Sequence, residues 1–164
     1  MNKLNIREKI AFIIFLVLTL IIIASIWHFT SQNGVLTNVN SGKIVKAIEN
    51  IASKLCNSDH ANVLKYSDLN HFIRKIAHFS EYMLLGSSIC VLLSLLLKRI
   101  KTALATTLSI CLLLSSLDEF RQLFISGRNA QLKDILIDLS GAVAGIIITR
   151  ILFLKFIKCS NTNR

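Results

Sequence analysis

Three apolar parts of the chain contain side chains that could transfer protons or bind ions. Lys75, His78 and Glu81 recur at steps of three residues and would share one face of a helix. Charged and amide side chains also lie at the end of a later apolar run, at residues 118–122, and at the start of the next run, at residues 134–138. Histidine and carboxylic acids are common general acids and bases, and Arg and Lys bind phosphate. The candidate catalytic residues are His78, Glu81, Asp118 and Glu119, and the candidate binding residues are Lys75, Tyr82, Arg121, Gln122, Arg128, Asp134 and Asp138.

These ionisable side chains lie within or next to runs long enough to cross a bilayer. A charge facing lipid at the centre of a membrane helix costs about 2.5–3.5 kcal/mol. We therefore expect the charged groups to face one another or a hydrated pocket. Basic and acidic residues are equally numerous among these ionisable side chains. A structural network that neutralises its own charge is therefore the alternative to a functional site.

The composition indicates a polytopic, all-α membrane protein. Of the 164 residues, 53% are hydrophobic, 17% are charged and none is proline. The chain contains four apolar runs of about 20 residues or more, enough to cross a hydrocarbon core about 30 Å thick. The first run exceeds the apolar region of a usual signal peptide, and no small-x-small cleavage site follows it. We predict one domain over residues 1–164, a four-helix bundle with spans at about 10–29, 73–97, 102–125 and 134–154.

Residues 30–72 form the longest hydrophilic connection, which we expect to be an outer loop. Apolar side chains between Ile44 and Leu55 recur at helical spacing, polar ones lie opposite, and Ser41 is the expected N-cap. This pattern predicts a surface amphipathic helix over residues 43–55. The helix lies either on the membrane or over the ends of the bundle, and the spacing does not distinguish the two.

The net charge of +10 is distributed unevenly along the chain. Ten Lys or Arg residues and one acid, Glu8, lie in the N-terminal segment, the 98–101 turn and the C-terminal end. The intervening segments contain nine Lys or Arg residues and eight acids. By the positive-inside rule, both termini are cytoplasmic and the polar layer faces the outer leaflet. The basic excess thus indicates topology and contact with membrane lipids, and we expect no nucleic-acid partner.

Cysteine and histidine spacing gives no sign of a metal centre. The four cysteines form no CxxC pair, so neither a disulfide nor a zinc site is expected. His78 and Glu81 are one helical turn apart, but two ligands make a weak metal signature. The chain also lacks a serine-nucleophile elbow and an HExxH motif. The sequence therefore predicts no metal ligands and does not identify a cofactor.

The charged segments resemble those of the VanZ-like family. They read K-x-x-H-F-x-E-Y from Lys75 to Tyr82, D-E-x-x-Q-x-F from Asp118 to Phe124, and Gly-Arg at residues 127–128. The joint occurrence of the three is specific, and the resemblance covers nearly the whole chain apart from residues 33–65. It implies a small four-span protein of the bacterial cytoplasmic membrane, in a family named for a protein associated with resistance to the glycopeptide antibiotic teicoplanin.

Three functions are compatible with these residues. The preferred one is binding or modifying an envelope lipid headgroup, such as that of a lipid-linked cell-wall precursor, with basic side chains holding phosphate. The second is an intramembrane hydrolase or transferase that uses acid–base or metal-assisted chemistry, with His78 as general base or metal ligand and the carboxylic acids as acid, base or ligand. The third is a structural subunit whose Gly141-x-x-x-Gly145 face packs against a partner. The oligomeric state does not follow from the sequence.

Overall fold

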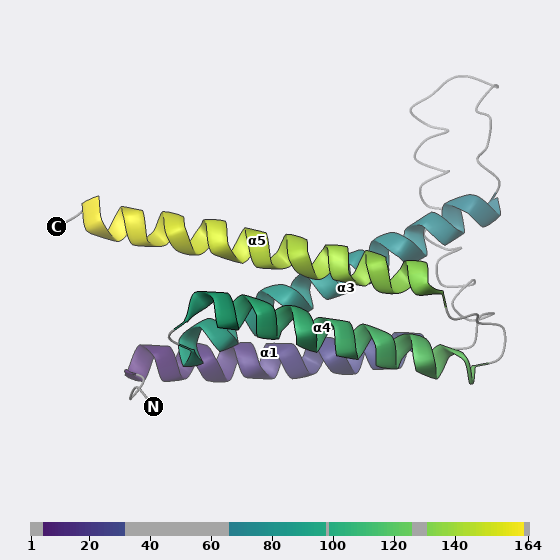
Figure 1. Ribbon diagram of the computed structural model, residues 1–164, viewed down its shortest axis with the longest axis horizontal. Helices are drawn as coiled ribbons and strands as arrows, with labels where there is room; N and C mark the ends of the chain where they lie inside the picture. Colours follow the sequence, from purple (N-terminus) through teal and green to yellow (C-terminus); the bar gives the residue numbers. More distant parts are fainter. Residues whose placement is uncertain (1–4, 32–65, 98, 126–130, 163–164) are drawn as a thin grey trace, which may run out of the picture.

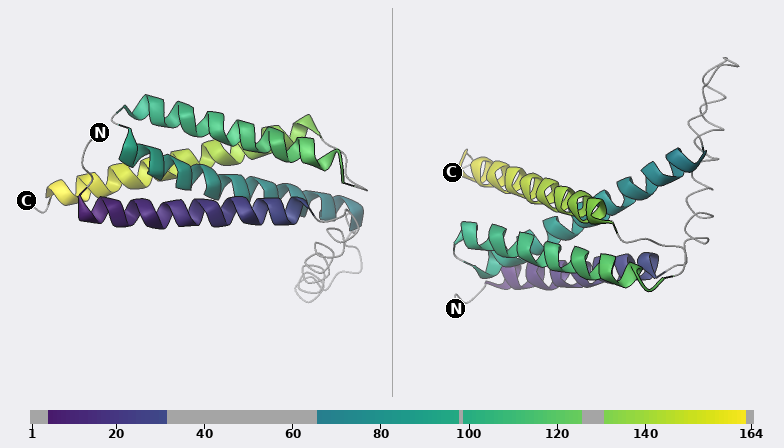
Figure 2. Two further views of the ribbon diagram at one scale, coloured as in Figure 1. Left: turned by 90° about the horizontal axis from the view of Figure 1, so that it is seen from below. Right: turned by 45° about the vertical axis from the view of Figure 1, so that its right-hand side comes forward.

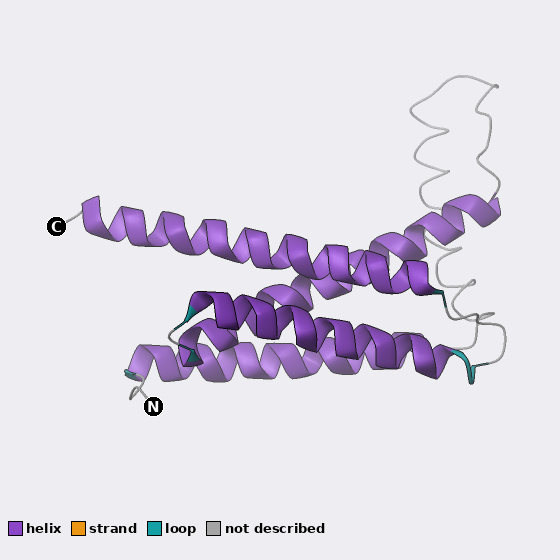
Figure 3. Ribbon diagram, in the orientation of Figure 1, coloured by secondary structure: helices purple, strands orange, loops and turns teal. Residues whose placement is uncertain are grey.

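The computed structural model describes residues 5–31, 66–97, 99–125 and 131–162, with side chains described for 5–31, 72–97, 99–125 and 131–152. Within these ranges the chain forms four helices (Figure 1 and Figure 3): α1 (Ile6–Thr30), α3 (Tyr66–Leu96), α4 (Ile100–Gln122) and α5 (Leu132–Thr162). The predicted all-α bundle is confirmed. The amphipathic helix predicted at residues 43–55 lies outside the described residues.

Each helix contains a stretch that is long and apolar enough to cross a membrane, namely Ile6–Thr30, Phe72–Leu96, Ile100–Gln122 and Leu132–Leu152. The chain has no proline to interrupt these helices. Two short segments predicted as loop, residues 66–72 and 132–133, are helical instead. The prediction was wrong there because polar side chains alone do not end a helix. The helix continues as long as its backbone N–H and C=O groups keep their hydrogen-bond partners within it.

α1 begins with a capping box. The Asn5 side chain accepts a hydrogen bond from the Glu8 backbone N–H (2.9 Å), and the Glu8 carboxylate accepts one from the Asn5 N–H (2.8 Å). Beyond this start, most of the large apolar side chains of α1 are exposed at the protein surface, as expected for a helix in contact with lipid. Thr19 and Ile26 belong to the strip that faces the other helices.

α3 is the central helix because it makes the most extensive contacts with the other three, above all with α5. Figure 2 shows α1 and α5 approaching it from different sides. On the α1 side, the Thr19 and Ser88 hydroxyls are hydrogen-bonded at 2.7 Å. The buried apolar cluster around α3 consists of Ile26, Tyr82, Leu85, Ile89, Cys111 and Ala142.

α3 and α5 run in the same general direction, cross each other (Figure 1) and approach at backbone distance. A Cβ added to Gly86 would lie 2.8 Å from a backbone oxygen of α5, and one added to Gly141 or Gly145 would strike the carbonyl oxygen of Phe79 or Met83. The close-packing role predicted for Gly141 and Gly145 is thus confirmed. Both glycines pack against α3 of the same chain, so the backbone contact that they allow is made within the bundle.

The start of α1 and the end of α5 lie at the same end of the bundle, together with the turn between α3 and α4 (Figure 1). At the opposite end, α1 and α4 finish and α3 and α5 begin. We call this second end the polar end, because the charged candidate residues of α3, α4 and α5 lie toward it.

Candidate functional site

An ion pair joins α3 to α5 at the polar end. Lys75 Nζ lies 3.0 Å from Asp134 Oδ1, and the two side chains are 26% and 18% exposed. Asp134 stands in the first turn of α5, where the helix dipole favours an acid. A partly exposed pair stabilises the fold by about 1 kcal/mol at most. The lysine ammonium has three N–H donors, so it retains donors for a second anion.

One turn deeper, Asp138 joins three helices. His78 Nδ1 of α3 lies 3.3 Å from Asp138 Oδ1, without the alignment of a hydrogen bond. The Ser115 hydroxyl of α4 donates to Asp138 Oδ2 at 2.6 Å. Asp138 is fully buried between these partners. In a Ser-His-Asp triad the histidine stands between the serine and the acid, so this arrangement does not activate Ser115 as a nucleophile.

The two acids of α4 are bonded through Gln122. Its side-chain nitrogen donates to Asp118 Oδ2 (3.3 Å) and to Glu119 Oε1 (3.1 Å). The other oxygen of Glu119 accepts a hydrogen bond from the Gln131 backbone N–H at 2.8 Å. Glu119 therefore ties the end of α4 to the start of α5. Both of its oxygens are occupied, which favours a positioning role over proton transfer.

Tyr82 brings an unpaired hydroxyl to the same group of acids. Its side chain is fully buried, and its hydroxyl faces Ser115, Asp118 and Asp138 but has no hydrogen-bond partner among the described residues. Asp118 Oδ1 is likewise unpaired, although the Thr30 hydroxyl of α1 lies near that carboxylate. Buried polar atoms normally have partners. Two without a partner mark a place where a polar ligand group would be stabilised.

Glu81 is half-buried and faces the same acids. It lies close enough to His78, Asp118 and Asp138 to interact with their charges. It makes no hydrogen bond or ion pair with another residue in the part of the chain that the structure describes. We call the following residues the carboxylate cluster: Glu81, Asp118, Glu119 and Asp138, with His78 and Tyr82.

Fixed cations do not neutralise this cluster within the described ranges. The close contacts between basic and acidic side chains found there join Lys75 to Asp134, which is outside the cluster, and His78 to Asp138, which is an ion pair only when the imidazole is protonated. The equal numbers of acids and bases in the sequence therefore do not translate into matched pairs among these residues. The local excess of acidic groups must be balanced by bound protons, water or a cationic ligand, because an isolated buried carboxylate is costly.

Arg121 turns away from the carboxylate cluster toward α1. Its guanidinium donates to the Ser31 hydroxyl and to the Trp27 carbonyl (3.4 Å), and it lies 4.6 Å from the centroid of the Trp27 ring. A cation over an aromatic face is attracted by the ring quadrupole. Arg121 thus links α4 to α1. Arg128, the other arginine inferred to bind phosphate, lies outside the described residues.

In the ranges described, no three His, Cys, Asp or Glu side chains are arranged to hold a metal ion. Cys90 and Cys111 are buried free thiols, and neither belongs to the cluster. The side chains of the cluster can themselves take part in hydrogen bonding, charge recognition and proton transfer.

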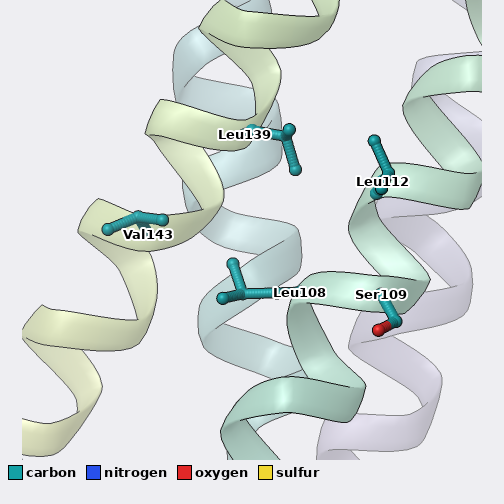
Figure 4. Close-up of a pocket in the computed structure, with 5 residues that line it drawn as sticks. All are labelled: Leu108, Ser109, Leu112, Leu139 and Val143. Carbon is teal, nitrogen blue, oxygen red and sulfur yellow. The ribbon is translucent and has the colours of Figure 1, made fainter.

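An apolar groove of about 320 Å³ lies between α4 and α5 beside the cluster (Figure 4). It adjoins the cluster because Leu139 directly follows Asp138 and Leu112 precedes Ser115 by one turn. A hydrocarbon lining suits a lipid chain better than a polar ligand. The groove is lined by Leu108, Ser109, Leu112, Leu139 and Val143.

Two residues that position the site were not predicted from the sequence. Ser115 lies three residues before Asp118 and seven before Gln122, so all three share a helix face and the signal was present. Gln131 acts through its backbone N–H on Glu119. No side-chain pattern indicates such a contact, because every residue except proline carries the same donor.

The sequence profile of the VanZ/LLP1 family matches residues 11–154. The chain belongs to the VanZ/LLP1 family. The match contains most of α1, the spanning parts of α3, α4 and α5, and the whole carboxylate cluster. The resemblance carried by the charged segments is confirmed, and membership with four spanning helices makes this a multi-pass VanZ-like membrane protein. Comparison with curated proteins and with solved structures gave no match.

Proposed function

We propose that this VanZ/LLP1 protein binds the headgroup of an envelope lipid at the outer leaflet of the bacterial cytoplasmic membrane. One observation carries the proposal: α3, α4 and α5 bring buried ionisable side chains together near one end of a bundle of membrane helices. Such groups are costly in a membrane and usually serve function. A lipid headgroup is a polar ligand that is always present near this depth.

The distribution of basic residues supports an outward-facing polar end. Arg99 and Lys101 lie at the end of the bundle that holds the start of α1 and the end of α5. Lysine and arginine are enriched on the cytoplasmic side of membrane proteins. Both termini are therefore cytoplasmic in our proposal, and the carboxylate cluster lies beneath the outer surface.

Lys75 is the described residue best placed to hold a headgroup phosphate. Its ammonium is partly exposed, and the pair with Asp134 leaves N–H donors unused. Arg128 is the second phosphate ligand inferred from the sequence, because a guanidinium donates two parallel hydrogen bonds. The α4–α5 groove would take one chain of the same lipid, and its place beside the Ser115–Asp138 contact supports this.

Lipid-linked cell-wall precursors are exposed at the outer leaflet, and we propose that they are among the envelope lipids whose phosphate the site binds. Binding such a precursor would change the targets that a glycopeptide antibiotic meets at the membrane surface. The expected consequence for the cell is a contribution to resistance against teicoplanin.

Trp27 allows a direct test, because it is the only tryptophan and lies near the polar end. Dibrominated phosphatidylglycerol bound at the site should quench its fluorescence. Lys75→Ala should weaken this binding about tenfold, since a charge-assisted hydrogen bond is lost, and Arg128→Ala should act in the same direction. Lys101→Ala, at the opposite end, is the matched control. Unchanged quenching and unchanged teicoplanin susceptibility in both variants would refute the proposal.

Acid–base chemistry on the same lipid is the second candidate function. The observation that favours it is the contact between His78 and Asp138 beside the unpaired Glu81, because an oriented imidazole near a second acid can transfer protons. Purified protein incubated with an envelope lipid extract should then alter a headgroup, as detected by mass spectrometry. His78→Gln and Glu81→Gln should abolish this turnover. An unaltered extract after incubation with the unmodified protein would exclude the catalytic candidate.

A further inference from the structure

The carboxylate cluster contains more hydrogen-bond acceptors than donors among the described residues. Within the described ranges, Asp118 Oδ1 has no hydrogen-bond partner and the Glu81 side chain forms no hydrogen bond. The nearby basic side chains are engaged elsewhere, Lys75 with an acid of α5 and Arg121 with α1. His78 is the one basic group of the cluster among the described residues, and it already faces Asp138. Apart from the His78 imidazole, no described side chain therefore brings a positively charged donor to the acids of the cluster.

An independent observation points into the same place. The Tyr82 hydroxyl is fully buried, faces Asp118 and Asp138, and has no hydrogen-bond partner in the part of the chain that the structure describes. A tyrosine hydroxyl can accept one hydrogen bond and donate another. It would therefore complete the surroundings of an N–H group held between the carboxylates.

We propose that the carboxylate cluster recognises the primary ammonium group of a lipid headgroup, as in phosphatidylethanolamine, an inference that rests on the lipid-binding function proposed above. Glu81 contacts the ammonium, because it is the half-buried acid of the cluster. Asp118 and Asp138 are fully buried behind it and add to the negative potential. The cluster thus selects the headgroup, whereas Lys75 holds the phosphate that all phospholipids share.

The spacing along α3 allows one headgroup to meet both ends of this site. Lys75 and Glu81 are six residues apart, or about 9 Å along the helix axis. Both side chains are long and flexible, so their charged groups can approach each other more closely than their backbones do. A headgroup lying along α3 would place its phosphate at the rim and its ammonium one to two turns deeper.

Native mass spectrometry of the full chain in detergent tests this inference. Phosphatidylethanolamine, phosphatidylcholine and phosphatidylglycerol with identical chains are titrated separately. Phosphatidylethanolamine should bind about tenfold more tightly than phosphatidylcholine, whose quaternary ammonium has no N–H donor. Glu81→Gln should remove this preference, and Asp118→Asn should reduce it. Ser80→Ala is the matched control, because that hydroxyl is exposed and bonds to the Ile76 carbonyl of its own helix.

Equal binding of the three lipids to the unmodified protein would overturn the inference without any variant. Retention of the preference in Glu81→Gln protein of unchanged helicity would also overturn it. Glycerophosphoethanolamine, the same headgroup without chains, distinguishes the source of the ammonium. If it binds as tightly as the lipid, the ligand is a soluble amine and the lipid assignment is wrong. Lys75→Ala should weaken the binding of all three lipids equally. If it leaves their binding unchanged, that result counts against the proposed lipid-binding function and not against headgroup selection.

Discussion

Replacing Gly145 by alanine should destabilise the bundle by forcing α3 and α5 apart. Besides striking the Met83 carbonyl oxygen, the added Cβ would lie 2.8 Å from Ser87 Oγ and 2.9 Å from the Met83 carbonyl carbon. Favourable contacts between carbon atoms lie at about 3.5–4.0 Å. Relief of the overlap therefore requires the two helix backbones to separate by roughly 1 Å.

The change in the free energy of unfolding combines three contributions of known magnitude. Overpacking of a tight contact costs about 1–3 kcal/mol. Separation also weakens the 3.1 Å hydrogen bond from Ser87 Oγ to the Gly145 carbonyl, which is worth about 0.6 kcal/mol inside a membrane protein. Alanine offsets up to about 1 kcal/mol of this through its higher helix propensity. We expect a net destabilisation of about 1–3 kcal/mol.

Unfolding in mixed micelles of dodecyl maltoside and increasing dodecyl sulfate, followed by circular dichroism, measures this difference. Gly86→Ala should act in the same direction, since its Cβ would lie 2.8 Å from the Ala142 carbonyl oxygen. Ala105→Leu adds more volume at an exposed position of α4 and serves as the control. If Gly145→Ala unfolds at the same detergent fraction as the unmodified protein, α3 and α5 do not approach at backbone distance and the packing described above is wrong.

Two further substitutions test individual contacts of the site. Ser115→Ala leaves Asp138 Oδ2 without its donor and should lower stability by about 1–3 kcal/mol in the same unfolding experiment. Ser109→Ala removes an exposed hydroxyl bonded to its own helix and should have little effect, so equal effects of the two would contradict the Ser115–Asp138 contact. Arg121→Ala removes the cation beside the Trp27 ring and should change the intensity or wavelength of its fluorescence emission; an unchanged spectrum would place Arg121 elsewhere.

The membrane helices could be predicted from the sequence because their causes are local. Each apolar run is long enough to satisfy its own backbone within a bilayer, and the chain has no proline to interrupt it. The close-packing role of Gly141 and Gly145 was also predictable from their spacing, since both must lie on one helix face. The family could be recognised for a related reason, because its charged motifs are contiguous in the chain.

The directions of the charged side chains were decided by tertiary structure. Arg121 lies one residue before Gln122, yet it bonds α1 while Gln122 bonds the acids of α4. Sequence spacing places Asp138 at the right depth but does not indicate that Ser115 and His78 would approach it from two other helices. Such contacts depend on the rotation of each helix about its axis, which is set by packing against its neighbours. The run of apolar residues therefore determines that a helix crosses the membrane, and only the packed bundle determines which charges meet inside it.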